Sequence, residues 1–340
     1  MTSTRPLVIG HRGASGYRPE HTAAAYELAF ALGADAVEPD VVLSKDGVPV
    51  VRHENEISGT TDVADRAEFA DRRTTKSIDG EWHTGWFTED FTWAELRTLR
   101  ARERLTSLRP GSATYDGRFG ILRLAEVLRL VEKASHFTPR TAVVELKHST
   151  YFDSIGLSLE NAVAAELETA GWAGSSERLV VESFEKSALF RLCDLGVRAR
   201  WIYLIEDSGT PFDQVARQGA ADAAPYAEAL TDAGLTALAG EVDGISLDKV
   251  TIMPRDGDGA APATSDVVER AHRAGLDVFT WTLRAENAFL PSDYRVGRTA
   301  GGFGRWQDEF AALLATGVDG VFADQPDLAI AARESVGGAN

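Results

Sequence analysis

The chain has 340 residues, and its 35 Lys and Arg against 52 Asp and Glu give a formal net charge of −17, which argues against broad nucleic-acid binding. A single cysteine, Cys193, excludes an intramolecular disulfide and a thiolate zinc site, and we expect it to be a small buried apolar residue. No apolar run approaches the roughly 18 residues that span a bilayer, and residues 1–6 lead too soon into a strand-like run for a secretory signal, so we expect a cytoplasmic protein without a membrane segment.

Short runs rich in β-branched and apolar residues recur along the chain, at residues 7–10, 36–43, 141–147, 179–184, 200–205, 244–247, 277–282 and 317–324. Most are apolar almost throughout rather than alternating, which is typical of parallel strands covered on both faces. Helical patterns lie between them, at residues 21–32, 122–134, 159–170, 185–195, 266–274 and 306–315. We therefore predict an α/β fold of the TIM (β/α)8 barrel type.

Three stretches do not follow this strand–helix rhythm. Residues 48–52 come after a hairpin turn signal, Lys45-Asp46-Gly47, and predict an antiparallel flap that places His53. Residues 54–119 are too long for a simple loop and predict an insertion subdomain over one face of the barrel, within a single domain of residues 1–340. The polar stretch 291–305, like the insertion, is either a solvated loop or a wall of a substrate pocket.

Acidic side chains lie where predicted strands end, and TIM barrels hold their active sites at the carboxyl ends of their strands. Glu38 and Asp40 are two residues apart on the second strand, so their side chains leave the same face. Glu145 and Lys147 repeat this spacing on the third strand. Three carboxylates are costly to gather in a barrel mouth unless a cation compensates them. Oxygen ligands without thiolates favour a hard divalent ion, Mg²⁺ or Ca²⁺.

Basic side chains lie beside these carboxylates. Arg12 follows His11 at the end of the first strand, and Lys147 lies two residues after Glu145. Arg12 and Lys147 are suited to hold an anionic group against the cation. His11 and His53 are suited to flank that group as proton donor and acceptor. The combination is typical of a site that cleaves a phosphate ester.

An ordered set of short motifs runs from Val8 to about Leu328. The set is His11-Arg12-Gly13-Ala14-Ser15-Gly16, Pro19-Glu20-His21-Thr22, Glu38-Pro39-Asp40, Asp46-Gly47, His53, Glu145-Leu146-Lys147, Glu182-Ser183-Phe184, Trp281-Thr282 and Ala323-Asp324-Gln325-Pro326. In this order the chain resembles the glycerophosphodiester phosphodiesterases, in particular the larger bacterial type with an insertion after the second catalytic histidine. Residues 61–66, Thr-Asp-Val-Ala-Asp-Arg, resemble that type as well.

The resemblance implies a TIM-barrel hydrolase with one divalent cation, Ca²⁺ or Mg²⁺. It implies an acid–base pair, His11 and His53; metal ligands Glu38, Asp40 and Glu145; and substrate-binding residues Arg12, Lys147 and Trp281. Two positions depart from the family pattern. The family often has Asn where His21 stands, and Asp-Pro or a similar pair where Glu54-Asn55 follows His53.

Several other residues invite a structural role. We expect Glu20 to cap the helix that begins near Thr22 and Ser183 to be a supporting hydroxyl rather than a nucleophile. Phe184, like Trp281, belongs either to the core or to a pocket wall. The remaining histidines are expected on helices or the surface, and they are His83, His136, His148 and His272.

The predicted reaction is hydrolysis of glycerophosphodiesters, small-molecule substrates, to an alcohol and sn-glycerol 3-phosphate. The attacking group is either the substrate's own glycerol hydroxyl, through a cyclic phosphate, or water. One alternative is a lysophospholipase D or other phosphodiesterase on the same scaffold, in which Trp82 and Trp86 hold an acyl chain. Another is a barrel that binds glycerophosphodiesters without cleaving them, although binding alone requires no acid–base pair.

Overall fold

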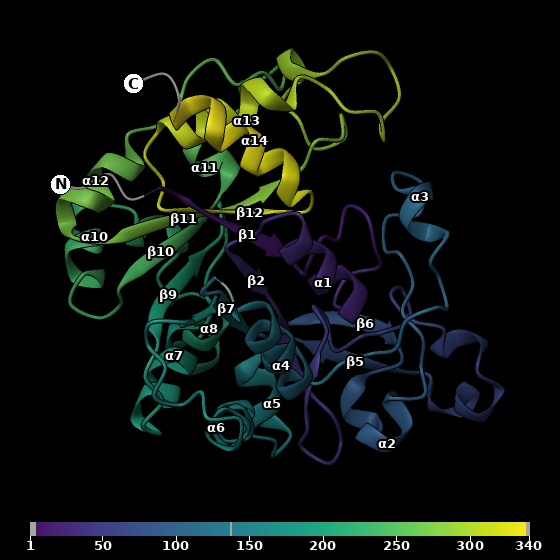
Figure 1. The fold of residues 1–340 in the computed structure, drawn as a ribbon. Coiled ribbons are helices and arrows are strands. Elements are labelled where there is room, and N and C mark those ends of the chain that lie inside the picture. The colour runs from purple at the N-terminus through teal and green to yellow at the C-terminus, as the bar shows by residue number, and fades with distance from the viewer. Residues whose placement is uncertain (1–4, 137, 338–340) are drawn as a thin grey trace.

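The computed structural model describes residues 5–136 and 138–337, and a closed parallel barrel lies at its centre (Figure 1). β1 pairs with β2 and β12, the chain of pairings continues from β12 through β11, β10, β9 and β8 to β7, and β7 closes the ring on β2. The barrel strands are β1 (Leu7–His11), β2 (Ala36–Glu38) continued by β3 (Asp40–Leu43), β7 (Thr141–Leu146), β8 (Leu179–Ser183), β9 (Arg200–Ile205), β10 (Gly244–Asp248), β11 (Asp277–Leu283) and β12 (Gly320–Ala323). The predicted TIM barrel is confirmed.

The second barrel strand is interrupted at Pro39, which has no N–H to donate to a neighbouring strand. The carbonyl of Pro39 still accepts a hydrogen bond from the amide of Glu145, at 3.0 Å, so β7 remains paired on both sides of the break. This arrangement keeps Glu38 and Asp40 beside Glu145 at the same end of the barrel.

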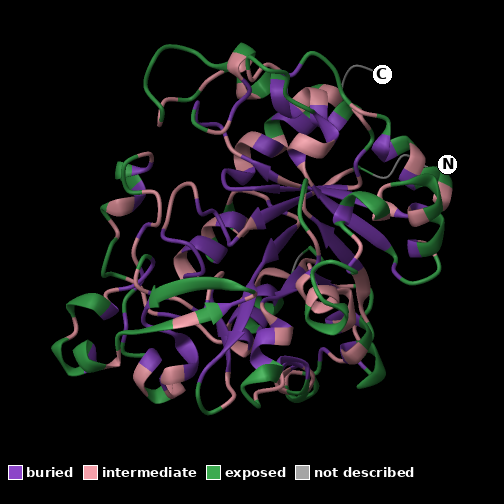
Figure 2. Cartoon of the chain, turned by 180° about the vertical axis from the view of Figure 1, so that it is seen from behind, coloured by how far each residue is buried: buried purple, intermediate pink, exposed green. Residues whose placement is uncertain are grey.

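The barrel interior is filled by a layer of buried apolar side chains. The layer takes one residue from most barrel strands, and its members are Ile9, Ala36, Val143, Val180, Ile202, Phe279 and Phe322. A side chain two positions further along a strand points to the same face. The next layer toward the carboxyl ends is therefore His11, Glu38, Glu145, Glu182, Leu204, Trp281 and Asp324. Figure 2 shows these strands buried at the centre of the molecule.

Helices surround the barrel, and the six predicted ones are present with ends within two residues of the prediction. They are α1 (Ala23–Ala31), α4 (Leu124–Ala134), α6 (Leu159–Thr169), α7 (Lys186–Asp194), α12 (Val267–Ala274) and α13 (Trp306–Ala315). Further helices, which the sequence pattern did not indicate, are α5 (Ser149–Ser154), α8 (Phe212–Gln218), α9 (Tyr226–Ala229), α10 (Asp232–Leu238), α11 (Lys249–Ile252) and α14 (Pro326–Gly337).

The predicted flap is also present. β4 (Pro49–Val51) pairs antiparallel with β3, and the amide of Arg52 continues this contact by donating to the carbonyl of Asp40 at 3.0 Å. The residue after Arg52 is His53, so the hairpin brings this imidazole to the carboxyl end of the second strand.

Residues 54–119 lie at one side of the barrel (Figure 1). They form a small antiparallel sheet of β5 (Thr74–Ile78) and β6 (Glu81–Gly85), the short helices α2 (Trp93–Leu96) and α3 (Pro110–Ala113), and 3₁₀ turns at Val63–Asp65, Ala67–Arg72 and Thr88–Asp90. Apolar side chains of this segment, such as Phe87 and Phe91, belong to the same buried cluster as Val41 and Val50 of the barrel hairpin. This shared core favours the single-domain organisation, which stays a prediction.

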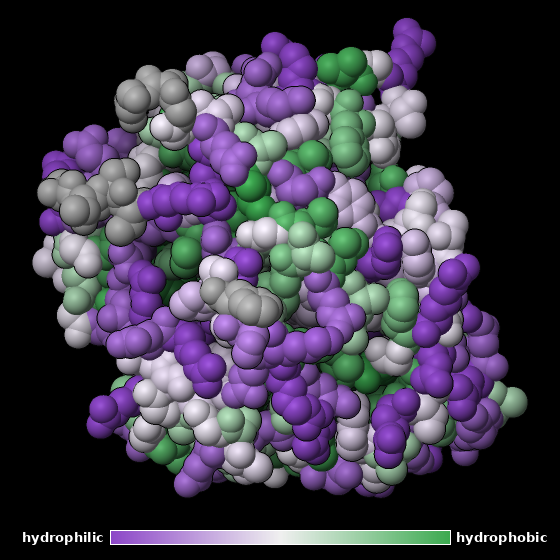
Figure 3. Space-filling model, in the orientation of Figure 1, coloured by the Kyte–Doolittle hydropathy of each residue, from purple (hydrophilic) through white to green (hydrophobic). Residues whose placement is uncertain are grey.

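The expectation that Cys193 is buried is wrong. Cys193 is exposed, because α7 turns Ala188, Leu189 and Leu192 toward the core and Cys193 away from it. No helix in the described part of the chain is long and apolar enough to cross a membrane. On the face seen in Figure 3, apolar residues form small areas between hydrophilic ones.

Candidate functional site

A cavity of about 930 Å³ opens at the carboxyl ends of the barrel strands. The layer of side chains that follows the apolar interior layer lines this cavity, with the exception of Asp324. Seven of the eight residues predicted for the site line it, namely His11, Arg12, Glu38, His53, Glu145, Lys147 and Trp281. The eighth, Asp40, is fully buried and joins the carboxylate cluster described next.

Glu38, Asp40 and Glu145 form the acidic cluster. One carboxylate oxygen of each lies within 4.8 Å of the other two, and all three residues are buried. Among the described residues, Oε1 of Glu38 and Oδ1 of Asp40 have no hydrogen-bond partner although they are shielded from solvent. Buried carboxylate oxygens that lack partners are expensive unless a cation satisfies them. The donor set therefore fits one hard divalent cation.

The three carboxyls have very different proton affinities. Burial, with the neighbouring Asp40 charge, raises the pKa of Glu38 well above its ordinary value. Burial likewise raises the pKa of Glu145 to about 8, although Lys147 opposes the shift. Burial opposes ionisation of Asp40 too, but His53, Lys147 and His21 hold its pKa well below the usual range. Without a cation, the cluster thus relieves its repulsion by holding protons.

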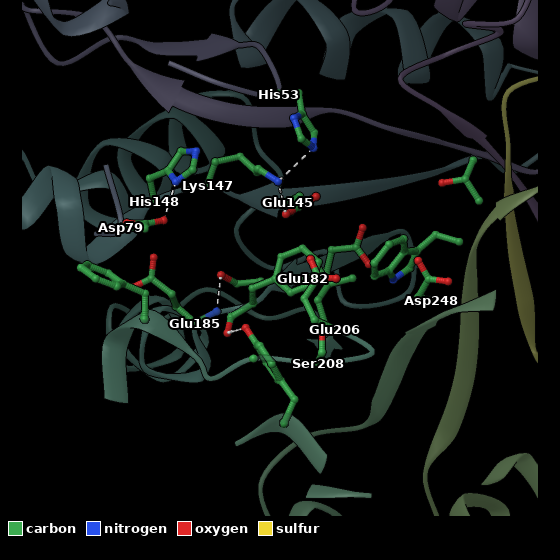
Figure 4. A pocket seen from close by; sticks show the side chains of 18 of the residues that line it. His53, Asp79, Glu145, Lys147, His148, Glu182, Glu185, Glu206, Ser208 and Asp248 are labelled. Atoms are coloured by element: carbon green, nitrogen blue, oxygen red, sulfur yellow. Dashed lines mark hydrogen bonds and ion pairs between the residues drawn. The ribbon is translucent and has the colours of Figure 1, made fainter. Parts of the chain in front are cut away.

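Two positively charged side chains, Arg12 and Lys147, flank the acidic cluster. The backbone amide of Arg12 donates to Oε2 of Glu38 at 2.8 Å, and the guanidinium lies 3.4 Å from Oδ2 of Asp40. Nζ of Lys147 donates to Oε1 of Glu145 at 2.8 Å (Figure 4). Both side chains are at least nine-tenths buried, so their charges act at short range in a poorly solvated site.

His11 is fixed by a carboxylate on the neighbouring strand end. Its Nδ1 lies 2.6 Å from Oδ1 of Asp324. Burial favours the neutral acid, but Arg284 and Arg109 hold the pKa of Asp324 well below its ordinary value, so Asp324 accepts and Nδ1 carries the proton. Nε2 is then the unprotonated nitrogen of the ring. Burial and the Arg12 charge lower the pKa of His11 to about 4.

His53 has the same arrangement with a different partner. Its Nδ1 lies 2.5 Å from Oε1 of Glu54, the next residue, and its Nε2 accepts from Nζ of Lys147 at 3.3 Å (Figure 4). Burial and the charges of Arg12 and Lys147 lower the pKa of His53 to about 3. Glu54-Asn55, a departure from the family pattern, thus supplies the carboxylate that orients this imidazole.

Aromatic and acidic side chains form the rest of the wall. Phe184 packs edge-on against both Trp281 and Tyr226, with ring centroids 5.8 and 6.5 Å apart, so these three rings belong to the pocket wall. Glu182, Glu206 and Asp248 also face this cavity (Figure 4). Glu182 belongs to one of the motifs of the family resemblance but was given no role, whereas Glu206 and Asp248 were not predicted, although each directly follows a predicted strand.

Glu20 does not cap the helix, contrary to expectation. Thr22 is the N-cap of α1 and accepts from the amide of Ala25, whereas Glu20 turns inward to Arg12 and Arg104. His21, where the family often has Asn, is fully buried and lies 2.8 Å from Oδ2 of Asp40. Ser183 is a supporting hydroxyl, since it donates to the carbonyl of Leu146 and accepts from the amide of Glu185.

The tryptophans proposed to hold an acyl chain do not line the cavity. Trp86 is buried and donates its indole N–H to the carbonyl of Phe69, whereas Trp82 is 76% exposed on β6. Two of the remaining histidines do line it. His148 is paired with Asp79 at 2.6 Å, and His83 stands on β6.

The sequence matches the glycerophosphoryl diester phosphodiesterase family over residues 11–328. It is 32% identical to glycerophosphodiester phosphodiesterase GDPD6 of Arabidopsis thaliana, over 95% of this chain and 85% of that protein. It is 26% identical to the glycerophosphodiester phosphodiesterase of Treponema pallidum, over 95% and 90%.

Solved structures show the same fold. A putative glycerophosphoryl diester phosphodiesterase from Silicibacter pomeroyi superimposes with a TM-score of 0.68 at 24% identity, covering 99% of this chain and 95% of that one. A phosphodiesterase from Oleispira antarctica, solved with its product sn-glycerol-3-phosphate, gives 0.60 at 21% identity, covering 96% of each chain. The family match and the full-length similarity to the Arabidopsis protein together place this chain in the glycerophosphoryl diester phosphodiesterase family.

Proposed function

We propose that the protein hydrolyses glycerophosphodiesters to an alcohol and sn-glycerol 3-phosphate. The observation that carries the proposal is the pair of imidazoles, each held at Nδ1 by a carboxylate, on one cavity with three clustered carboxylates. Oriented imidazoles of this kind serve proton transfer, and a binding protein has no need of them. The names of the relatives support the same reaction.

Glu38, Asp40 and Glu145 would hold one divalent cation, Ca²⁺ or Mg²⁺. When bound, such an ion polarises a phosphoryl oxygen and neutralises charge that develops in the transition state. Carboxylate oxygens are ligands of both ions.

The two imidazoles divide the proton transfers. With Nδ1 protonated, Nε2 of one ring takes the proton from the attacking hydroxyl, and protonated Nε2 of the other gives a proton to the leaving alkoxide oxygen as the P–O bond breaks. A bound phosphodiester is negatively charged, which raises the pKa of both rings from their low values and lets one of them serve as the acid. If the attacker is the glycerol hydroxyl, the rings exchange roles when water opens the cyclic phosphate.

Arg12 and Lys147 would hold the non-bridging phosphate oxygens, and Trp281 would contact the organic part of the substrate. Arg12 is kept in place by Glu20, with a distance of 3.2 Å between Nη1 and Oε2. Lys147 lies between Glu145 and His53 and so joins the acidic cluster to the acid–base pair. Charges fixed before the substrate binds need no reorganisation during the reaction.

The test is an enzyme-coupled assay of sn-glycerol 3-phosphate after incubation with glycerophosphocholine and either Mg²⁺ or Ca²⁺. We expect release that stops with a chelator and returns with added ion. Lysophosphatidylcholine is the parallel substrate and is followed by the release of choline, because its cleavage gives choline and lysophosphatidic acid and no sn-glycerol 3-phosphate. Cleavage of this lipid alone would support the lysophospholipase D alternative, and binding of glycerophosphocholine without cleavage would support the non-catalytic one.

A further inference from the structure

Two arginines from one turn of the 54–119 segment each reach a carboxylate that orients a catalytic imidazole. Arg104 spreads its guanidinium across Glu54, with Nη1 2.7 Å from Oε1 and Nη2 2.6 Å from Oε2. Oε1 of Glu54 is also the atom that accepts from His53. A forked contact of this kind fixes the plane of the carboxylate as well as its distance.

Arg109 makes the corresponding contact on the other side of the cavity. Its Nη2 lies 2.6 Å from Oδ2 of Asp324, whose other oxygen accepts from His11. Its Nε is 2.7 Å from Glu286, and its Nη1 is 3.2 Å from the carbonyl of Ser15. The Arg109 side chain is only 5% exposed, so these contacts are shielded from water.

The turn between the two arginines is held by its own hydrogen bonds. The amide of Arg109 donates to the carbonyl of Leu105 at 2.8 Å, and the amide of Leu105 donates to Oε1 of Glu103 at 2.8 Å. The amide of Arg102 donates to the carbonyl of Thr60 at 2.9 Å. This turn therefore presents both guanidinium groups at a fixed spacing.

Arg104 also contacts the group that holds the phosphate-binding arginine. Its Nε and Nη2 lie 2.9 and 2.7 Å from the two oxygens of Glu20, and Glu20 pairs with Arg12. One guanidinium therefore bridges the carboxylate behind His53 and the carboxylate behind Arg12.

We propose that Arg104 and Arg109 are positioning residues, and that the turn between them sets the orientation of His11 and His53 together. The inference rests on the proposed function for its kinetic consequence, and it assigns to the 54–119 segment a role in the chemistry. Without Arg104, Glu54 loses the partner that fixes it, and its side chain is one-third exposed and free to rotate into water. The proton of His53 is then no longer confined to Nδ1.

The kinetic test compares R104A, R104K and R109K with wild type, each loaded with Mg²⁺ or Ca²⁺. The control is R102A, which removes the same charge from the same segment, since Arg102 pairs with Asp65 away from the cavity. We expect R104A to lower kcat by about 10- to 100-fold with KM changed much less, because groups that orient catalytic ligands typically have effects of this size. R104K keeps the charge without the fork, so we expect it to recover only part of the loss. R102A should match wild type.

A second measurement reports on the imidazole itself. In the loaded full chain with ¹⁵N-labelled histidine, NMR identifies which ring nitrogen of His53 carries the proton. We expect Nδ1–H in wild type and R102A, and a mixture of tautomers in R104A. An unchanged tautomer in R104A, or a kcat within 2-fold of wild type, would overturn the proposal. If wild type cleaves no glycerophosphodiester, the proposed function has failed, yet the tautomer comparison still decides the positioning role. Thermal melts verify that each variant is folded. The Arg104 side chain is 29% exposed, so its variants are the ones expected to fold. If R109K does not fold, the Arg104 variants decide the proposal.

Discussion

Asp40 and Glu145 lie directly opposite each other in the parallel register of β3 and β7, so two carboxylates face each other inside the barrel mouth. Both are buried, and the strand pairing prevents them from moving apart. Burial, and after it the neighbouring Asp40, raise the pKa of Glu145 to about 8, although Lys147 opposes the shift. This relationship connects cation binding to stability, because the same charges that would bind the ion destabilise the protein without it.

Glu145→Gln is therefore expected to abolish cation binding without lowering the stability of the cation-free protein. The amide keeps an acceptor for Lys147 but removes one of the facing charges, so the cation-free variant should be no less stable than wild type. Added Mg²⁺ or Ca²⁺ at 100 times Kd should raise the free energy of unfolding of wild type by about 3 kcal/mol, and its melting temperature with it. The stability of the variant should not change when the ion is added. Elemental analysis should find the ion only in wild type.

Glu185→Gln is the matched control, since Glu185 is a buried acid of the same cavity whose pKa burial raises to about 7 and which lies outside the acidic cluster. Its cation content should equal that of wild type. Equal cation stabilisation in the Glu145 variant would show that the ligands have been misassigned.

His11→Ala and His53→Ala should each reduce kcat by about 10²- to 10⁴-fold, the usual contribution of a general acid or base. The double variant should lose little more than the worse single one, because the two groups act as a unit. His272→Ala is the control, since this imidazole pairs with Asp319 and does not line the cavity. Steady-state kinetics on glycerophosphocholine makes the comparison, and full turnover in either cavity variant would remove that residue from the mechanism.

The low pKa of His11 makes acid stability depend on this residue. An unfolded histidine binds a proton below about pH 6.5, whereas folded His11 does so only near pH 4. Between these values the unfolded chain holds the extra proton, so the free energy of unfolding falls as the pH drops from 6.5 to 4, by about 3 kcal/mol in total. Above pH 6.5 the residue has no such effect.

Urea unfolding of the cation-free protein at several pH values tests this expectation. His11→Asn should show a shallower loss of stability than wild type between pH 6.5 and 4, with parallel curves above pH 7. Identical slopes for the two proteins would mean that His11 does not remain neutral when folded.

Gly13 controls the loop that carries Arg12. Its φ of +88° is unfavourable for other residues, and a Cβ there would lie 2.6 Å from the backbone carbon of Ala25. Gly13→Ala should lower the free energy of unfolding by about 1–3 kcal/mol and displace Arg12, reducing activity further. Gly59→Ala is the control, because nothing lies within 4 Å of its Cβ position. A Gly13 variant as stable as the control would contradict the strain argument.

The fold could be predicted well because parallel barrel strands are apolar almost throughout, and most of the eight runs show this pattern. The three carboxylates could be grouped because strand ends in a barrel meet at one rim. The short helices α8 to α11 could not be found, since four to seven residues carry too little periodicity.

The partners of the site residues were harder to predict than the residues themselves. Arg109 and Asp324 are 215 positions apart, and no local pattern links residues at such a separation. Glu20 had the sequence context of a helix cap, but the buried charges of Arg12 and Arg104 drew it inward. Trp86 was considered as an acyl-chain contact only under the lysophospholipase D alternative, because an aromatic residue in an insertion can belong either to a pocket or to a core, and here the ring is buried in the hydrophobic core.

We propose that Glu38, Asp40 and Glu145 hold one divalent cation between the two imidazoles. Anomalous diffraction from crystals grown with Mn²⁺, a scatterer that accepts the same oxygen ligands, tests it most directly. We expect one strong peak bounded by these three carboxylates and facing both His11 and His53, and no such peak in Glu145→Gln crystals. No peak at the cluster, or a peak that excludes one of the three residues, would contradict it.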